Sequence, residues 1–471
     1  MQTDPHIQAQ IQIPATLIWV QCIAFVVLYG AWILPEVVGF RNTALVLGAL
    51  TGLYPIYQYR AYLIQKRSIP IWLIVGLFAW ATFHLLFLAQ EYPLQALEFK
   101  RIWKYTAIGS IFALGLGLSL ANSTWSASLK GKKSPFWPMI YFGLCLPALI
   151  YLLKYVLSIY GGILGIEASP AFKIALHPSW PYWVGKTDYV AFCLPTLAVS
   201  LGQILLLLRL PTRKVSQWIE MGVYFLMTTA TLFLFYIQDI KNGLAYAVLC
   251  ILLFATLLLF GGSSIKLRHK WALVVVIVSA LVAVLYPHVQ KHDSWGTLIA
   301  DTKIAFQLDQ YPHWKYAGAQ GYPNNEYGTV VYSANYERAA WFKAGILLAG
   351  QNPLGYGLIE DSFKKMAKIR WPEVSPNLSH SHSGWLDVVL AMGLPGFCCI
   401  LGALFIALRQ SWEALEPWKS LVFWSLLANV LLWITTEVSA TVTFAALIFW
   451  VTLAGGLTLM GSHQKGNPVQ A

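Results

Sequence analysis

The sequence of 471 residues is poor in charge: Asp, Glu, Lys and Arg together make up 11% of it, whereas hydrophobic residues make up 58%. Soluble domains carry about 25% charged residues, which they need to cover a hydrated surface. The mean hydropathy is +0.59. Such a chain cannot solvate itself as a globule, and these values predict a polytopic membrane protein of the all-α class.

The sequence also lacks the motifs of several enzyme and transporter classes. It has no P-loop, no Gly-x-Gly-x-x-Gly after a strand, no Asp-x-Asp pair and no Gly-x-Ser-x-Gly. These absences argue against an ATP-driven pump and against a metal-dependent nucleotide-sugar transferase. All six cysteines lie in apolar segments and show neither C-x-x-C nor zinc-ligand spacing. We therefore expect no cofactor and no metal.

Runs of about 20 apolar residues, the length that crosses a bilayer, predict twelve transmembrane helices. The expected spans are 14–35, 43–59, 70–90, 102–121, 136–157, 189–208, 217–237, 242–262, 271–289, 385–407, 418–436 and 440–461. They divide the chain into spans one to nine (1–289), a polar segment (290–384) and spans ten to twelve (385–471). The predicted fold is thus an all-α bundle of about 12 helices with one large, partly helical periplasmic loop.

Basic residues follow every even-numbered span. They are Arg60, Lys66, Arg67, Lys130, Lys132, Lys133, Arg209, Arg213, Lys214, Lys266, Arg268, Lys270, Arg409 and Lys419. Because Lys and Arg are enriched in cytoplasmic loops, both termini are expected in the cytoplasm, with 158–188 and 290–384 on the outer face. The net charge of +12 then reflects membrane topology, and we expect membrane lipid rather than nucleic acid as a partner.

The segment 290–384 has the chemistry of a soluble domain, with nine Lys or Arg residues balanced by eight acids. A helix is predicted from Ser333, as its cap, to Gly350, which ends it. Residues near 358–369 predict a second, short amphipathic helix. The turn 352–357 has no titratable group and is expected to shape the segment rather than to react.

Two histidines, His380 and His382, lie immediately before span ten. A neutral imidazole can take a proton from an attacking hydroxyl, and a turn at the mouth of a transmembrane helix is a suitable mount for it. Two other interpretations stay open. The turn can be a polar interfacial segment with Trp385 in the aromatic belt, or the His pair can bind a metal, although no neighbouring ligand set supports this.

Charged residues occur at three further outer positions. Arg338, beside Glu337 near the start of a predicted helix, can clamp a phosphate group, or the two can form a solvated ion pair. Asp239 and Lys241 occupy a tight turn between spans seven and eight, where a charge at bilayer depth favours a functional role over a snorkelling side chain. Lys186, before span six, is a weaker instance of the same pattern.

Four motifs in order make the sequence recognisable. They are Glu337-Arg338-x-x-Trp341, Asn352-Pro353-Leu354-Gly355-x-Gly357, His380-x-His382-x-x-Trp385-Leu386-Asp387 and Gly393-Leu394-Pro395-Gly396. This ordered set resembles the O-antigen ligase/polymerase superfamily, and most closely the lipopolysaccharide O-antigen ligase. The motifs cover about 60 residues, and the twelve-span layout extends the likeness to the whole chain.

The resemblance implies a glycosyltransferase of the bacterial inner membrane with a periplasmic active site. Its donor would be a glycan linked to undecaprenyl diphosphate, and its acceptor a sugar hydroxyl of the lipid A–core. The donor carries its own leaving group, so no ATP is needed. Back-side attack would invert the configuration of the anomeric carbon. By analogy with the family, no metal takes part. His382 would be the catalytic base and Arg338 would stabilise the diphosphate. The residues expected to bind substrate are Lys241, His380, Glu337, Asp239 and Lys186.

The sequence departs from the family pattern at two positions. The family's essential histidine normally precedes Asn, whereas His382 precedes Ser383. The basic residue before span eight is usually Arg, whereas here it is Lys241, which keeps the charge but lacks the fork that grips a diphosphate. Arg338 is for this reason the firmer of the two predicted diphosphate ligands.

Other functions remain alternatives to the ligase. An O-antigen polymerase would join lipid-linked repeat units, and often divides its outer chemistry between two sizeable loops rather than one. A protein O-oligosaccharyltransferase of the same superfamily is a further alternative. A polyprenyl-lipid transporter or flippase would instead place charges in mid-span and repeat broken helices in two halves, a symmetry that the sequence does not show.

Overall fold

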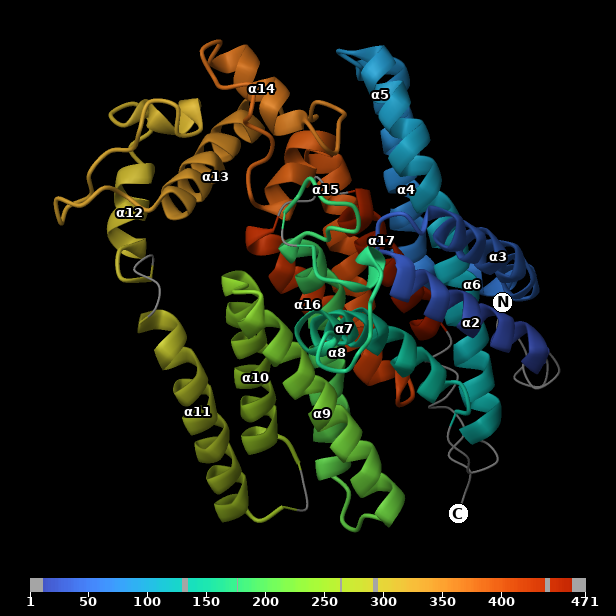
Figure 1. The fold of residues 1–471 in the computed structure, drawn as a ribbon. Helices are drawn as coiled ribbons and strands as arrows, with labels where there is room; N and C mark the ends of the chain where they lie inside the picture. The colour runs from blue at the N-terminus through green and yellow to red at the C-terminus, as the bar shows by residue number, and fades with distance from the viewer. Residues whose placement is uncertain are drawn as a thin grey trace.

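The computed structural model describes residues 12–128, 134–175, 177–262, 265–290, 295–436 and 441–459. Lys130, Lys132 and Lys133, on which part of the predicted sidedness rests, lie outside these residues, as do both chain termini. Within the described ranges the chain is helical, and its one extended pairing is an isolated bridge between Asn324 and Val330. Figure 1 shows a bundle of long helices with three shorter helices, α12, α13 and α14, gathered at one end.

Each of the twelve expected spans overlaps a helix. These helices are α2 (Ala15–Ala31), α3 (Val38–Gln58), α4 (Ile69–Phe83), α6 (Lys104–Ser128), α7 (Trp137–Tyr160), α8 (Lys186–Leu208), α9 (Val215–Ile237), α10 (Lys241–Phe260), α11 (Leu267–Gln290), α15 (Gly384–Ser411), α16 (Trp418–Thr435) and α17 (Thr441–Thr458). Among the described residues, nine helical stretches are long and apolar enough to cross a membrane. The apolar helices α2 and α17 are shorter, and α3 is not among the nine. The protein is thus an all-α polytopic membrane protein.

The helix of span four departs from its expected bounds of 102–121. It begins at Tyr92, because α5 (Tyr92–Glu98), a π-helical turn η4 (Phe99–Trp103) and α6 form one helical stretch of 36 residues. At 1.5 Å per residue this length exceeds the hydrocarbon thickness of about 30 Å. The charged residues 98–104 interrupt the apolar run but not the helix, whose first turns project beyond the bundle beside α14 (Figure 1).

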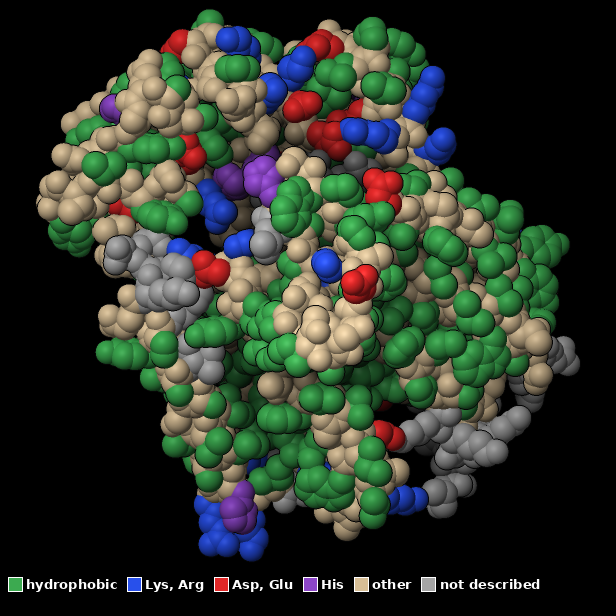
Figure 2. Space-filling model, in the orientation of Figure 1, with side chains coloured by type: hydrophobic (Ala, Val, Ile, Leu, Met, Phe, Trp, Pro, Cys, Tyr) green, Lys and Arg blue, Asp and Glu red, His purple; other side chains and the backbone are tan. Residues whose placement is uncertain are grey.

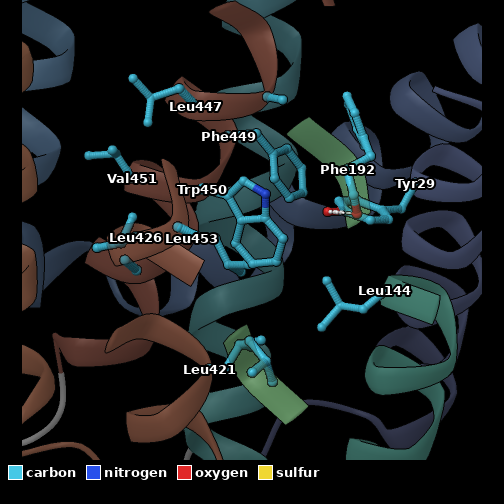
Figure 3. Close-up of a cluster of buried hydrophobic side chains, with 14 of the residues drawn as sticks. Tyr29, Leu144, Phe192, Leu421, Leu426, Leu447, Phe449, Trp450, Val451 and Leu453 are labelled. Carbon is cyan, nitrogen blue, oxygen red and sulfur yellow. Dashed lines mark hydrogen bonds between the residues drawn. The ribbon is translucent and has the colours of Figure 1, made fainter. Parts of the chain in front are cut away.

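Aromatic and aliphatic side chains from distant helices form the core of the bundle (Figure 3). Tyr29 of α2 donates a hydrogen bond to the Phe192 carbonyl of α8 (3.1 Å), and its ring packs against Trp450 of α17. Glycine permits the closest approach between helices: a Cβ on Gly115 of α6 would lie 2.3 Å from the Cα of Gly52 on α3. Close backbone contact of this kind is how membrane helices gain packing energy without a hydrophobic driving force.

The segment between α11 and α15 has a core of its own, built on α12 (Leu298–Ala305), α13 (Ser333–Gln351) and α14 (Ser362–Arg370). The Trp341 indole N–H donates to the Trp314 carbonyl (3.0 Å), and the Tyr336 hydroxyl donates to the Tyr311 carbonyl (2.6 Å). Buried Asp301 accepts hydrogen bonds from several neighbouring loop groups. We call this side of the molecule the loop end.

Two details of the predicted loop helices are wrong. Tyr332 is the N-cap of α13 and makes no side-chain capping bond, so Ser333 is the first helical residue rather than the cap. The second helix begins at Ser362 rather than near 358, because Glu98 accepts the backbone N–H groups of Ile359 (2.6 Å) and Glu360 (3.1 Å) and holds them in a turn. The helix α12 has no counterpart in the sequence-based expectation.

The turn 352–357 shapes the fold, because it packs into a break in α15. Tyr356 N–H donates to the Leu390 carbonyl (2.8 Å), and Gly393 has φ 65°, which interrupts the helix. A Cβ on Gly393 would lie 2.3 Å from the carbonyl carbon of Leu354, and one on Gly355 would lie 2.5 Å from the Ala391 oxygen. The two glycine motifs therefore form one interlocked joint, and span ten is a broken helix rather than the continuous one expected.

Basic residues gather at the end opposite the loop helices. Arg67, after α3, forms an ion pair with Glu413 in the α15–α16 connection, and its carbonyl accepts a hydrogen bond from Gln410 (3.1 Å). Lys270 donates to the Gly261 carbonyl (2.9 Å) between α10 and α11. Figure 2 shows Lys, Arg and His side chains clustered at the foot of α10 and α11. The connections predicted to be cytoplasmic thus share one end of the bundle where they are described.

Candidate functional site

The His382 turn is held by hydrogen bonds to the first turn of α15. His382 lies two residues before the helix, with φ 58°, and Ser383 is the N-cap. Buried Asp387 accepts from the Ser381 N–H (3.0 Å) and the Ser381 hydroxyl (2.6 Å), and it donates its own N–H to the Ser383 carbonyl. A left-handed conformation costs a residue other than Gly about 1–2 kcal/mol, so these bonds sustain a strained backbone that fixes the imidazole.

Aromatic contacts orient the His382 ring. It stacks on Trp341 of α13 with 5.1 Å between ring centroids and 7° between planes. The His380 ring meets it edge-on at 4.3 Å and 89°. His382 and His380 are both half-buried. The two histidines singled out from the sequence therefore lie side by side, with one imidazole face covered by an indole.

The turn is also joined to α16. The Ser383 hydroxyl donates to the Trp433 carbonyl (3.4 Å), and the Trp385 indole donates to the Val430 carbonyl (3.1 Å). The end of α16 is in turn bound to α10, where the Tyr246 hydroxyl hydrogen-bonds to Thr435. Helix α16 thus brings the start of α15 and the start of α10 together, although 141 residues separate His382 from Lys241 in the sequence.

Backbone geometry explains the tight turn at Asp239. Helix α9 ends in a Schellman motif, in which Ile240 N–H donates to the Phe235 carbonyl (2.9 Å) and Asp239 N–H donates to the Tyr236 carbonyl (3.1 Å). Asp239 is the left-handed residue of this motif, with φ 54°, and Ile240 is buried. The turn places Lys241 as the first residue of α10.

Three cations converge at Lys241. Arg338 of α13 and Lys186 of α8 lie close enough to act electrostatically on the Lys241 ammonium, as does one acid, Asp239. The ammonium also lies over the Tyr332 ring, 5.1 Å from its centroid. Lys186 and Lys241 are each the first residue of a helix, where the helix dipole disfavours a cation. Repulsion among these groups is relieved by an anion, which the helix N-termini also attract.

The cation cluster adjoins the histidines through α13. Arg338 precedes Trp341 by three residues, about one helical turn, so both side chains lie on one face of α13. Trp341 carries the His382 stack, and Arg338 is exposed. Figure 2 shows His side chains together with Lys and Arg side chains around a hollow between the loop helices and the membrane helices. The structure therefore brings His382, His380, Arg338, Lys241, Lys186 and Asp239 into one region.

The side chain of Glu337 contacts the loop core rather than the cation cluster that includes its neighbour Arg338. Its carboxylate accepts a hydrogen bond from the Tyr322 hydroxyl (2.7 Å). Burial raises the pKa of the Glu337 carboxyl above its ordinary value, and the Tyr322 hydrogen bond opposes that rise. Among the described residues no ion pair joins Glu337 to Arg338. This contact indicates that Glu337 stabilises the fold of the loop segment, whereas Arg338 belongs to the cation cluster.

An apolar cavity of about 910 Å³ lies between α8, α9, α10 and α11. Leu208 and Trp218 line the end of the cavity near the foot of the bundle, and Tyr236 and Leu244 line the end nearer the loop end. Leu244 is three residues after Lys241, so the cavity reaches to within one helical turn of the cation cluster. The site thus combines an anion-attracting group of side chains with a long apolar space beneath it.

Some residues of this site were not recognised from the sequence. Tyr332, over Lys241, and Tyr246, which fixes α10 to α16, gave no local signal. Asp387 was noted as part of a motif and as a charge within span ten but was given no role, although a buried acid at the head of a membrane helix is itself a functional signal. No group of three or more His, Cys, Asp or Glu side chains suited to a metal ion occurs in the described part of the chain.

Residues 229–401 match a family model described as O-antigen ligase. The match confirms the resemblance to the O-antigen ligase/polymerase superfamily, and it supports a function of the O-antigen ligase or polymerase type, carried out by a membrane glycosyltransferase-like enzyme. It includes Lys241, Arg338 and His382 but not Lys186. The family implies lipid-linked glycan substrates in a membrane environment. No curated protein matches the chain.

Proposed function

We propose that the protein is an O-antigen ligase, which transfers glycan from undecaprenyl diphosphate to a sugar hydroxyl of the lipid A–core. The observation that carries the proposal is the convergence of Arg338, Lys186 and Lys241 beside the His382 turn. A diphosphate would complement the net positive charge that Asp239 leaves on these three cations. We further propose that the loop end faces the periplasm of a bacterial inner membrane and that both termini are cytoplasmic, which the basic connections at the opposite end support.

The chemistry follows from the roles of these groups. His382 accepts the proton of the acceptor hydroxyl as its oxygen attacks the anomeric carbon. The bond between that carbon and the diphosphate oxygen breaks, and the oxygen leaves with the electron pair. Arg338 and Lys241, with the N-terminus of α10, stabilise the charge on the departing diphosphate. Attack opposite the leaving group inverts the anomeric configuration.

The apolar cavity supports a lipid-linked donor. A polyprenyl chain is long and apolar, and the lining between α8 and α11 is predominantly apolar. The upper end of the cavity reaches the turn that carries Lys241, so a chain lying in it would present its diphosphate to the cation cluster. A donor carried on a soluble nucleotide would make no use of this space.

A deletion strain distinguishes the ligase from the alternatives on a lipopolysaccharide gel. Loss of all O-antigen bands, with accumulation of lipid-linked polymer, is the result expected of a ligase. A core that bears a single repeat unit would identify a polymerase and overturn the proposal. Loss of lipid-linked glycan from the outer leaflet would identify a flippase. Expression of the wild-type chain should restore the bands, whereas His382→Ala should not.

A further inference from the structure

The helical stretch that contains α5 and α6 carries three basic residues at the loop end. Lys100, Arg101 and Lys104, which we call the outer rim, are all exposed. Lys100 and Lys104 lie four residues apart, on one face of the helix. The family match begins at residue 229 and does not reach them. The cation cluster described above also does not include them.

Contacts with the loop segment fix the outer rim at this end. Arg101 forms an ion pair with Glu360, and Glu91, just before α5, pairs with Lys365 of α14 (2.8 Å). Between these pairs, Glu98 binds the turn before α14. Figure 2 shows Lys and Arg side chains along the edge where α5 lies, beside acids between α5 and α14.

The outer rim places exposed cations at an end of the bundle where they favour an anionic ligand. Lys and Arg are enriched on the cytoplasmic side of membrane proteins, whereas the outer rim lies at the opposite end from the basic connections. Arg101 is neutralised by Glu360, whereas Lys100 and Lys104 form no ion pair within the described ranges. Exposed apolar side chains adjoin them in the same helix, including Tyr92 (54% exposed) and Leu97 (63%). Cations beside lipid-facing apolar groups lie at the level of headgroups.

We propose that the outer rim binds the phosphate groups of the acceptor glycolipid, an inference that rests on the proposed ligase function. Lipid A carries phosphates on its sugars at headgroup level, which complements Lys100 and Lys104 in charge. In Figure 1, α5 and the α10–α11 pair lie on opposite sides of α15. The two lipid substrates therefore reach His382, at the head of α15, from different sides: the donor along the apolar cavity and the acceptor along α5.

Hydrogen bonds connect the outer rim to the catalytic turn. The segment that Glu98 holds at residues 359–360 follows the turn 352–357, whose Gly357 N–H donates to the Ala391 carbonyl of α15 (2.7 Å). Ala391 lies in the same helix as Asp387, which fixes the His382 turn. An acceptor anchored at Lys100 and Lys104 is thus held by a framework continuous with the base that deprotonates it.

The test compares Lys100→Gln/Lys104→Gln with Lys214→Gln/Lys266→Gln, which removes the same charge from exposed sites at the opposite end. Each full-length variant is reconstituted in phosphatidylcholine nanodiscs. Binding is measured with purified bisphosphorylated lipid A, with its dephosphorylated form, and with phosphatidylglycerol. The KM for lipid A–core and for donor is then measured in the transfer reaction.

We expect the outer-rim variant to bind lipid A about 25-fold more weakly, because each of its two Lys residues contributes about a fivefold gain toward anionic lipid at a membrane surface. Its acceptor KM should rise by a similar factor, with kcat and donor KM unchanged. The wild type should bind dephosphorylated lipid A as weakly as the variant does. Unaltered binding in the outer-rim variant, an equal loss in the control, or equal affinity for phosphatidylglycerol would each overturn the proposal.

The binding measurement keeps this inference separate from the ligase proposal. If the wild type transfers no glycan to lipid A–core but binds lipid A through Lys100 and Lys104, the ligase reaction fails while the phosphate site stands. If transfer proceeds but the outer-rim variant has a normal acceptor KM, the ligase reaction stands and the phosphate site fails.

Discussion

The Trp341 indole lies parallel to the His382 imidazole, with 5.1 Å between ring centroids and 7° between planes. These residues belong to two different motifs of the sequence, 41 residues apart. The stack covers one face of the imidazole, so the ring cannot turn toward the face that Trp341 occupies. A base that must meet one hydroxyl benefits from this restriction, because misplacement by about 1 Å can cost 10²-fold in rate.

Replacing Trp341 should therefore impair the chemical step. We expect Trp341→Ala to lower kcat by roughly 10²-fold, and Trp341→Phe, which keeps a flat ring, to lower it by much less. The control is Trp371→Ala, which removes an aromatic ring that packs on Trp314 in the same loop core without contacting His382. Equal losses in Trp341→Ala and Trp371→Ala, measured by single-turnover transfer, would mean that only loop folding is affected.

The two histidines should differ in importance. His382→Ala should lower kcat by about 10²–10⁴-fold, the usual contribution of a general base, while the protein stays folded and inserted. His380→Ala should be milder, because His380 contacts His382 edge-on and does not hold the motif position. In vitro transfer with matched amounts of each variant checks this. Near-normal activity of both variants would contradict the assignment of the base.

Arg338 and Lys241 should respond differently to exchange of one cation for the other. Arg338→Lys keeps the charge but loses the paired donors, and a charge-assisted hydrogen bond contributes about 1.5–3 kcal/mol. We expect kcat/KM to fall roughly 10- to 100-fold. Lys241→Arg should be tolerated or improve activity, because it adds donors toward the same anion. If both exchanges were tolerated alike, Arg338 would have a structural role only.

The joint between α15 and the turn 352–357 should depend on Gly393. Gly393→Ala forces an alanine to φ 65° and places its Cβ 2.3 Å from Leu354, so we expect a loss of at least about 1–2 kcal/mol in stability. Gly350→Ala, where no atom lies within 4 Å of the added Cβ, is the matched control. Thermal unfolding in detergent should show a lower midpoint for Gly393→Ala alone. An unchanged midpoint would argue against a rigid joint.

The mechanism makes a prediction about metals and energy. If His382 takes the proton and Arg338 with Lys241 holds the diphosphate, the purified protein should transfer glycan with EDTA present and ATP absent. A metal held by His380 and His382 would instead make activity sensitive to EDTA and restorable by zinc or manganese. Such a result would overturn this mechanism even though the family resemblance would remain.

The sequence by itself determined the class of the protein and most of its helices. Apolar runs specify membrane helices because a backbone in lipid must satisfy its own hydrogen bonds, so every expected span overlaps a helix. Periodic and capping signals likewise located α13 to within one residue at its end. The roles of Arg338, Lys241 and His382 were inferred from motifs, and those roles remain proposals.

Only the tertiary structure decided how these pieces meet. The sequence separates Lys186, Lys241, Arg338 and His382 widely, and α13 and α16 bring them together through side-chain contacts that no local pattern encodes. The extension of α6 toward the loop end was missed because charged residues end an apolar run without ending a helix. The charged turns of this helix are held by the loop segment: Arg101 pairs with Glu360, and Glu98 accepts the Ile359 N–H. The break at Gly393 was likewise hidden, since a glycine adopts positive φ only where a neighbouring segment requires it, and here that segment is the turn 352–357.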